Sequence, residues 1–247
     1  MDDHIFETNF FDTSVLICAA NQLEENSNKA YKIFKQGDFL ICHVVLNEIE
    51  ALSKRRIKIY NSLLQTKSKP TEPIWGFIEK VINKTNIENL NDKTRIEQTF
   101  TQVLNNLGIE KETILSDTEW SNFELELNKV FHQMKNRLYD VEHSFADHSY
   151  SLKHVVQKYN SDSNHRTLLH NLKQRISSES RHHNDLWILA NATVHAYKNH
   201  LFITFVSNDG LHTTNIKKIY DVVDSIYSTI IQEARELTVC SLRNLAG

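Results

Sequence analysis

The chain has 247 residues, of which 40% are hydrophobic and 24% charged, enough for one large globular domain or for one domain carrying an insertion. The formal net charge of −3 excludes a protein that coats nucleic acid by overall basic charge, so any such binding needs local patches. Three widely spaced cysteines argue against a disulfide framework, and we recognise neither a signal peptide nor an apolar run of the ~18–20 residues needed to span a membrane, so we expect a soluble, cytoplasmic protein without membrane association.

The first part of the chain alternates between predicted strands and predicted helices. Residues 4–12 and 38–45 predict strands, and the second is a nearly continuous apolar run typical of a strand buried on both faces. Helices are predicted over 14–22, 27–36 and 46–65. This alternation predicts an α/β fold with an open parallel sheet.

The middle of the chain has a different pattern, which begins after Pro70 and Pro73. Amphipathic helices are predicted over 91–108, 116–141 and 144–159. No strand signal occurs among them. We therefore predict an all-α insertion at 71–160 between the two parts of the α/β domain, 1–70 and 161–247.

The last part returns to the α/β pattern. A helix is predicted over 184–199, a buried strand over 201–207 and a closing helix from about 215 to 237. The insertion holds 10 Lys and Arg against 14 Asp and Glu, which makes it a poor phosphate platform by charge alone. Basic residues cluster instead in "SKRRIK", which contains Arg55 and Arg56.

Four acids lie at the edges of the predicted α/β elements. Asp12 ends the first strand, Glu48 opens the helix after the second, Asp185 begins an apolar helix, and Asp209 follows the strand over 201–207. Ligands of open α/β sheets bind at the carboxyl ends of the strands, so these acids can meet in one pocket. Carboxylates that share one pocket repel one another and stay ionised only beside cations. Ligation by oxygen atoms alone selects Mg²⁺ or Mn²⁺. Such ions support the hydrolysis of phosphodiesters.

The stretches "FFDTSVLI", "VVLNEIEAL", "NDLWILANA" and "FVSND" together resemble the four acidic motifs of the PIN domain, in the same order and local setting. The resemblance covers roughly 1–65 and 165–225, and the insertion departs from the compact toxin-type PIN proteins. It implies an α/β PIN-like sheet and a metal-dependent endoribonuclease, in RNA processing, as a toxin or as a defence effector.

The resemblance also implies roles for individual residues. Asp12, Glu48, Asp185 and Asp209 would be the catalytic acids and the metal ligands. Ser14 and Ser207 match small polar residues of the family, and Ser14 would help to orient a ligand. The substrate would be RNA. The phosphate contacts that we expect are Arg55, Arg56 and Arg181, each of which could equally belong to a solvated face.

Each acid also has an ordinary structural interpretation. Asp12 and Asp185 could cap helices, Asp209 could be a turn residue, and Glu48 could be a first-turn acid favoured by the helix dipole. Glu50 is a rival for the role of Glu48, although a two-residue offset puts the two side chains on different helix faces.

Two other functions remain open beside the nuclease. A haloacid-dehalogenase-like phosphatase also begins with an Asp at the end of its first strand, but it needs a second acid two residues later, where this chain has Ser14. A non-catalytic PIN-like scaffold would use the insertion to bind RNA or a protein partner, such as an antitoxin or a regulator. The apolar stripes of the insertion could also pack on the α/β core or form a homodimer.

Overall fold

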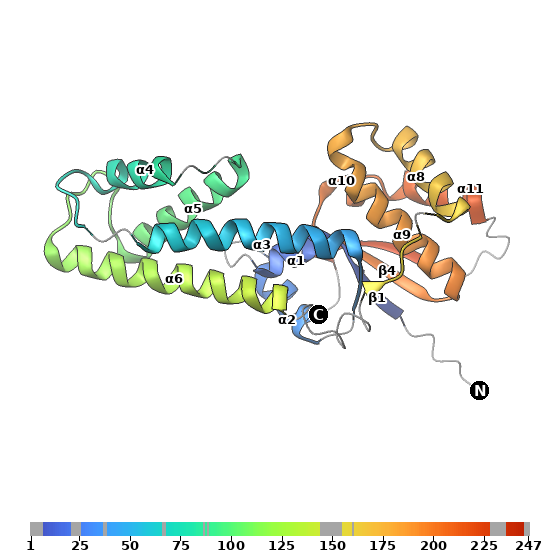
Figure 1. The fold of residues 1–247 in the computed structure, drawn as a ribbon, viewed down its shortest axis with the longest axis horizontal. Coiled ribbons are helices and arrows are strands. Elements are labelled where there is room, and N and C mark those ends of the chain that lie inside the picture. Colours follow the sequence, from blue (N-terminus) through green and yellow to red (C-terminus); the bar gives the residue numbers. More distant parts are fainter. Residues whose placement is uncertain are drawn as a thin grey trace. The chain divides into compact units, whose positions relative to one another are not determined.

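The computed structural model describes residues 7–20, 26–36, 39–65, 68–85, 87, 89–143, 155–159, 161–227 and 236–244. The chain divides into two compact units (Figure 1). The first unit combines Met1–Glu50 with Val141–Gly247, and the second is Ala51–Asp140.

The first unit is built on a parallel sheet. Its strands are β1 (Glu7–Phe11), β2 (Phe39–Cys42), β3 (Val155–Val156), β4 (Phe202–Ser207) and β5 (Leu237–Ser241). They lie in the order β3-β2-β1-β4-β5, and every pair of neighbours is parallel. The order reverses direction between β1 and β4, which is where doubly wound sheets bind ligands, outside the carboxyl ends of the strands.

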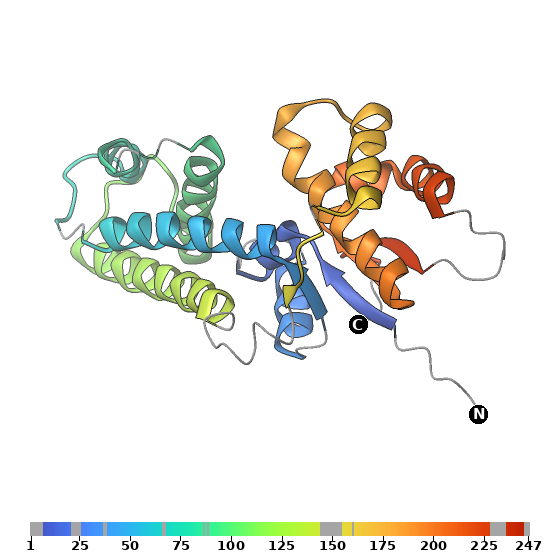
Figure 2. The same ribbon diagram turned by 45° about the vertical axis from the view of Figure 1, so that its right-hand side comes forward.

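Helices flank this sheet, as the alternating sequence predicts. They are α1 (Thr13–Ala20), α2 (Ser27–Gln36), α8 (Ser163–Arg175), the 3₁₀ turn η1 (Ser180–His182), α9 (His183–Asn199), α10 (Gly210–Thr214) and α11 (Ile216–Tyr227). Helix α9 contacts β2, β4 and β5, so it crosses the sheet (Figure 2). Phe11 of β1 stacks on Phe39 of β2, which in turn contacts Phe34 of α2. The α/β prediction is confirmed.

The second unit contains only helices among the residues described. Helix α3 (His43–Leu64) begins in the first unit and continues into the second, where it is joined by α4 (Ile74–Lys84), α5 (Leu90–Leu107) and most of α6 (Asp117–His143). Phe100 of α5 contacts Phe123 and Phe131 of α6, and all three rings are buried. No helix in the described ranges combines the length and apolar character needed to cross a membrane.

Local signals in the sequence set several helix ends of the second unit. Asn89 accepts a hydrogen bond from the backbone of Asp92 and so caps the start of α5. Gly108 ends the same helix with a φ of 66°, a left-handed conformation that glycine adopts without strain. Ser116 and Glu119 exchange hydrogen bonds in a capping box at the start of α6.

Two predicted helices are wrong in part. Val155 and Val156, placed in a helix over 144–159, form the edge strand β3, while 144–154 lie outside the described residues. The closing helix is described as far as Tyr227, residues 228–235 lie outside the described residues, and "LTVCS" forms β5, a β-branched segment suited to a buried strand. The compact helical unit spans Ala51–Asp140, whereas we predicted 71–160, because α3 continues unbroken and β3 joins the sheet.

Candidate functional site

Asp12 lies at the carboxyl end of β1, where its backbone N–H donates to the carbonyl of Val206 in β4 (3.0 Å). Only 2% of the residue is exposed. Its Oδ1 accepts a hydrogen bond from the backbone of Thr13 (2.8 Å), and its Oδ2 accepts from the hydroxyls of Ser14 (2.7 Å) and Ser207 (2.9 Å). A buried carboxylate is therefore held in one orientation by donors from two strand ends.

The two serines join these strand ends directly. The hydroxyls of Ser14 and Ser207 lie 3.3 Å apart, and the Ser14 hydroxyl also accepts from the backbone N–H of Asn208 (2.9 Å). The Ser207 hydroxyl accepts from the backbone N–H of Asp209 (3.0 Å). Both serines thus contact the acid beside which the sequence places them, and they fix the loop after β4 against the start of α1.

Glu48 reaches the same region from α3. Its Oε2 accepts a hydrogen bond from the hydroxyl of Thr13 (2.5 Å), and its Oε1 accepts from the side-chain amide of Asn184 (2.7 Å). These donors are the immediate neighbours of two other predicted acids, Asp12 and Asp185. Because the contacts belong to Glu48, the structure favours it over Glu50, whose side chain is exposed.

Asp185 stands in the first turn of α9, with its side chain partly buried. Its Oδ2 lies 3.3 Å from Nδ1 of His182. Burial raises the pKa of the Asp185 carboxyl, and the negative charges of Asp12 and Asp209 raise it further, against the opposing influence of the His182 hydrogen bond and of His212. The charges of Asp12 and Asp209 are therefore close enough to the Asp185 carboxyl to raise its pKa.

Asp209 follows β4 and caps the short helix α10, because its Oδ1 accepts from the backbone N–H of Leu211 (2.7 Å). The capping interpretation from the sequence is therefore correct for this residue. The charge of Asp209 also contributes to the raised pKa of Asp185. The cap fixes where the carboxylate lies.

His212 is a site residue that the sequence does not indicate. It is fully buried, its Nδ1 lies 3.2 Å from the Ser207 hydroxyl, and its Nε2 lies 3.3 Å from the backbone carbonyl of Asp185. Nδ1 is also 4.0 Å from Oδ2 of Asp12. The ring packs edge-on against Phe205. His212 thus links α10, β4 and α9 behind the acids, a role that only the folded arrangement reveals.

Cys42 ends β2 next to these acids and is fully buried. Burial raises the pKa of its thiol to about 12, the backbone N–H groups of Val44 and Val45 oppose that increase, and the charges of Asp12 and Glu48 add to it. Both acids therefore act on one point at the end of β2. Asp12 and Asp209 thus follow the ends of β1 and β4, Glu48 lies in α3 and Asp185 lies in α9, and their charges act on one another or on the Cys42 thiol.

The donor set suits a hard divalent cation in kind, because it consists of carboxylate oxygens with uncompensated negative charge around Asp185. The side chains are nevertheless turned towards hydroxyl, amide and backbone donors. In the described part of the chain, no three His, Cys, Asp or Glu side chains are arranged so that they could hold a metal ion. Ion binding would require the carboxylates to exchange some of these donors for the cation.

The three expected phosphate contacts differ in their surroundings. Arg56 is buried, and its Nε donates to Oδ1 of Asp92 (2.9 Å), so its role is structural as placed, because a buried and paired guanidinium cannot reach a substrate. Arg55 is 45% exposed and donates from Nε to the other oxygen of Asp92 (2.6 Å). Arg181 is exposed in η1 and pairs with Glu179 (2.5 Å). Arg55 and Arg181 keep the exposure that a phosphate contact needs.

Sequence reasoning missed Thr13, Asn184 and His212, which hold the acids in place. Thr13 and Asn184 each stand next to a predicted acid, and that adjacency is the one signal that could have found them. No family model, curated protein or solved structure that we compared with the chain matches it.

Proposed function

We propose that the chain is a metal-dependent endoribonuclease of PIN type, with Asp12, Glu48, Asp185 and Asp209 as its acids and Mg²⁺ or Mn²⁺ as its cofactor. The observation that supports the proposal is electrostatic: the charges of Asp12 and Asp209 act on the Asp185 carboxyl, and those of Asp12 and Glu48 act on the Cys42 thiol, beside the edge where doubly wound sheets bind ligands. The order of the four motifs along the chain supports it further.

The residues of the chain have distinct tasks in such a reaction. Asp12 is held in one orientation by Ser14 and Ser207, and it would exchange one of these hydroxyl donors for the cation. Glu48 is positioned through Thr13 and Asn184. The chemistry that a bound divalent ion supplies is polarisation of the phosphodiester and activation of water.

A haloacid-dehalogenase-like phosphatase stays disfavoured. The residue two positions after Asp12 is Ser14, whose hydroxyl donates to Oδ2 of Asp12. A hydroxyl in that position orients the first carboxylate but does not offer the carboxylic acid that this chemistry needs.

A non-catalytic scaffold is the second candidate. It is favoured by the hydrogen bonds that satisfy Asp12 and Glu48 within the chain, and by the finding that no three described side chains could hold a metal ion as they stand. Such a protein would bind RNA or a protein partner through its helical unit, or would form a homodimer there.

Cleavage of labelled single-stranded RNA and DNA tests the proposal, with Mg²⁺, Mn²⁺ or EDTA. We expect metal-dependent cleavage of RNA, lowered at least about 100-fold in Asp12→Asn, because changes even to residues behind the ligands cost about 10–100-fold. The matched control is Asp221→Asn, which neutralises an exposed acid of α11 in the same unit.

Glu48→Gln provides a second variant in case Asp12→Asn does not fold, because Glu48 is less buried than Asp12. Equal cleavage by both variants and the wild type would remove the nuclease assignment. Absence of cleavage by folded wild type in both metals would favour the scaffold.

A further inference from the structure

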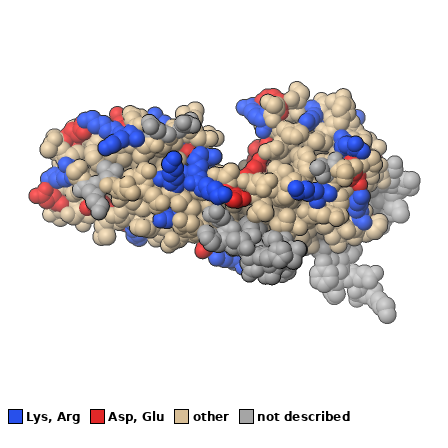
Figure 3. Space-filling view, viewed as in Figure 1, with Lys and Arg blue, Asp and Glu red and all other residues tan. Residues whose placement is uncertain are grey.

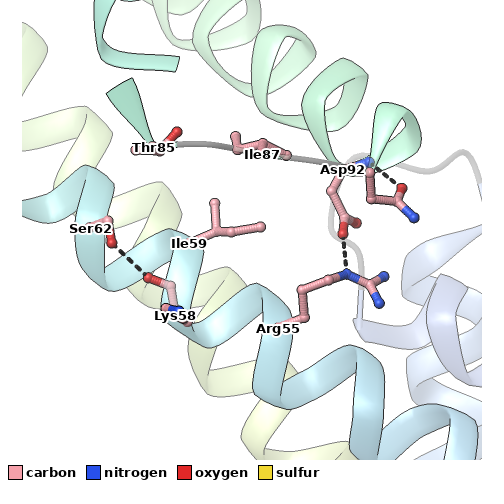
Figure 4. A pocket seen from close by; sticks show the side chains of 8 residues that line it. Arg55, Lys58, Ile59, Ser62, Thr85, Ile87 and Asp92 are labelled. Atoms are coloured by element: carbon pink, nitrogen blue, oxygen red, sulfur yellow. Dashed lines mark hydrogen bonds and ion pairs between the residues drawn. The ribbon is translucent and has the colours of Figure 1, made fainter. Parts of the chain in front are cut away.

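The strongest site outside the acids is a hollow in the second unit. A pocket of about 720 Å³ lies between α3 and the segment that joins α4 to α5, a volume within the range of ligand-binding clefts. Ile59 and Ile87 border it on opposite sides, and Arg55 points to Asp92 at one end (Figure 4). The pocket therefore combines apolar walls with charged groups.

A second hollow continues the first. It has a volume of about 640 Å³ and shares Ser62 and Thr85 with the first pocket. Phe77, Lys80, Val81 and Lys84 of α4 also line it. Together the two pockets form a groove between α3 and α4, which we call the α3–α4 groove.

The charge of the α3–α4 groove is positive. Its lining contains Arg55 and Lys58 in the first pocket, and Lys80 and Lys84 in the second. Among the described lining residues Asp92 is the one acid, and its two oxygens accept from Arg55 and Arg56. Figure 3 shows Lys and Arg side chains gathered over the middle of α3 and over α4. The groove therefore has an excess of cations.

Two of these cations are available for a ligand. Lys80 already holds Glu72. Lys58 and Lys84 are exposed, and neither ammonium group has a hydrogen bond or ion pair with a residue in the described ranges. A like-charged, unpaired pair of lysines in a concave surface attracts anions. Arg55 adds a guanidinium that Asp92 holds in position.

The lining of the α3–α4 groove also includes an aromatic side chain, Phe77. Phe77 lines the second pocket and packs edge-on against Trp120, with 5.5 Å between the ring centroids, so its orientation is fixed. A positively charged groove with an aromatic platform is the arrangement that binds single-stranded nucleic acid, since phosphates follow the cations and unpaired bases stack.

We propose that the α3–α4 groove binds a single-stranded RNA segment, with Lys58, Lys84 and Arg55 contacting its phosphates and Phe77 contacting a base. The choice of RNA as the ligand rests on the proposed function. The groove assigns an RNA-binding role to the helical unit, which the overall charge of the predicted insertion argued against.

Binding of a labelled single-stranded RNA to the full chain tests this, in EDTA so that no metal-dependent cleavage can occur. We expect Lys58→Ala/Lys84→Ala to bind at least about tenfold more weakly, which is the effect of losing one charged hydrogen bond. The dependence of the logarithm of affinity on the logarithm of salt concentration should fall by about 0.7 for each phosphate that the variant no longer neutralises. The matched control, Lys217→Ala/Lys218→Ala, removes two exposed lysines of α11 and should bind as the wild type does.

Equal affinity of the groove variant and the wild type would overturn the proposal, as would a wild type that does not bind RNA. Displacement of the RNA by millimolar inorganic phosphate or adenosine monophosphate alone would also overturn it, in favour of a small phosphate ligand. The two proposals separate cleanly. RNA binding that depends on Lys58 and Lys84, without cleavage when metal is supplied, would support the groove proposal and remove the nuclease proposal. Metal-dependent cleavage with RNA binding that does not depend on these lysines would support the nuclease proposal and remove the groove proposal.

Discussion

Each unit of the molecule buries one carboxylate almost completely, and the two are stabilised in different ways. Asp12 and Asp92 are both 2% exposed. Asp92 lies between the guanidinium groups of Arg55 and Arg56, whereas Asp12 is held by two hydroxyls and a backbone N–H. The helical unit therefore neutralises its buried charge internally. The α/β unit orients its charge without neutralising it, which suits an arriving cation.

The surroundings of the acids also decide the direction in which their pKa values shift, as Asp92 and Asp185 show. Burial raises the pKa of the Asp92 carboxyl, but the hydrogen bonds and charges of Arg55 and Arg56 together outweigh burial and lower it. For Asp185, burial and the charge of Asp12 act in the same direction and raise the pKa. Asp92 is thus surrounded by positive charge and Asp185 by negative charge, and the pKa of each carboxyl shifts accordingly.

The largest effect on stability is expected for Asp92→Ala. The change leaves Arg56 buried without its partner, and breaking a buried pair in this way costs about 3–5 kcal/mol. Urea denaturation followed by circular dichroism measures it. Asp117→Ala is the control, because its pair with Lys69 is exposed and solvent screens it. Similar losses for both variants would contradict the structural role of Asp92.

A smaller effect of opposite sign is expected for Asp185→Asn. A neutral amide removes the repulsion from Asp12 and Asp209, so the free energy of unfolding in EDTA should rise by about 0.5–1 kcal/mol. Thermal denaturation beside Asp221→Asn measures the change. A clear loss of stability in Asp185→Asn would show that the acids of the first unit are compensated within the chain.

The smallest effect is a difference in pH dependence between the two acids. The lowered pKa of Asp92 gives stability that is present above its usual pKa of 3.8 and is lost as the pH falls below it. The raised pKa of Asp185 has the reverse consequence, since stability is lost as the pH rises from 3.8 through the folded value. The stability gap between wild type and Asp92→Ala should narrow below about pH 4.

For Asp185→Asn the comparison with wild type runs the other way, and its advantage should grow as the pH rises from about 4. Chemical denaturation of the three proteins at several pH values provides both curves. Parallel curves for all three would mean that neither carboxyl changes its pKa on folding.

The sequence predicts the sheet well where a strand is long and apolar. Phe39–Cys42 and Phe202–Ser207 are buried apolar runs, which the sequence predicts as strands. Val155–Val156 has only two residues, and it becomes a strand because it pairs with β2, more than a hundred residues earlier. Such tertiary pairing overrides local preference.

The site shows the same limit. The four acids could be proposed from the sequence because residue type and position beside a predicted strand or helix are local properties. His212 could not be proposed from the sequence, because its role depends on contacts with Ser207 and with the backbone of Asp185. These residues approach it only in the folded chain. The same holds for Arg56, whose partner Asp92 stands 36 residues away.

The buried thiol of Cys42 has a practical consequence. With its pKa raised to about 12, this cysteine carries almost no thiolate at neutral pH, and the thiolate is the form that alkylating reagents attack. Because Cys42 is fully buried at the end of β2, a reagent reaches it only when that part of the sheet opens. The rate at which Cys42 itself is alkylated, measured separately from Cys18 and Cys240 and with and without Mg²⁺, would therefore report the local opening of the sheet beside Asp12.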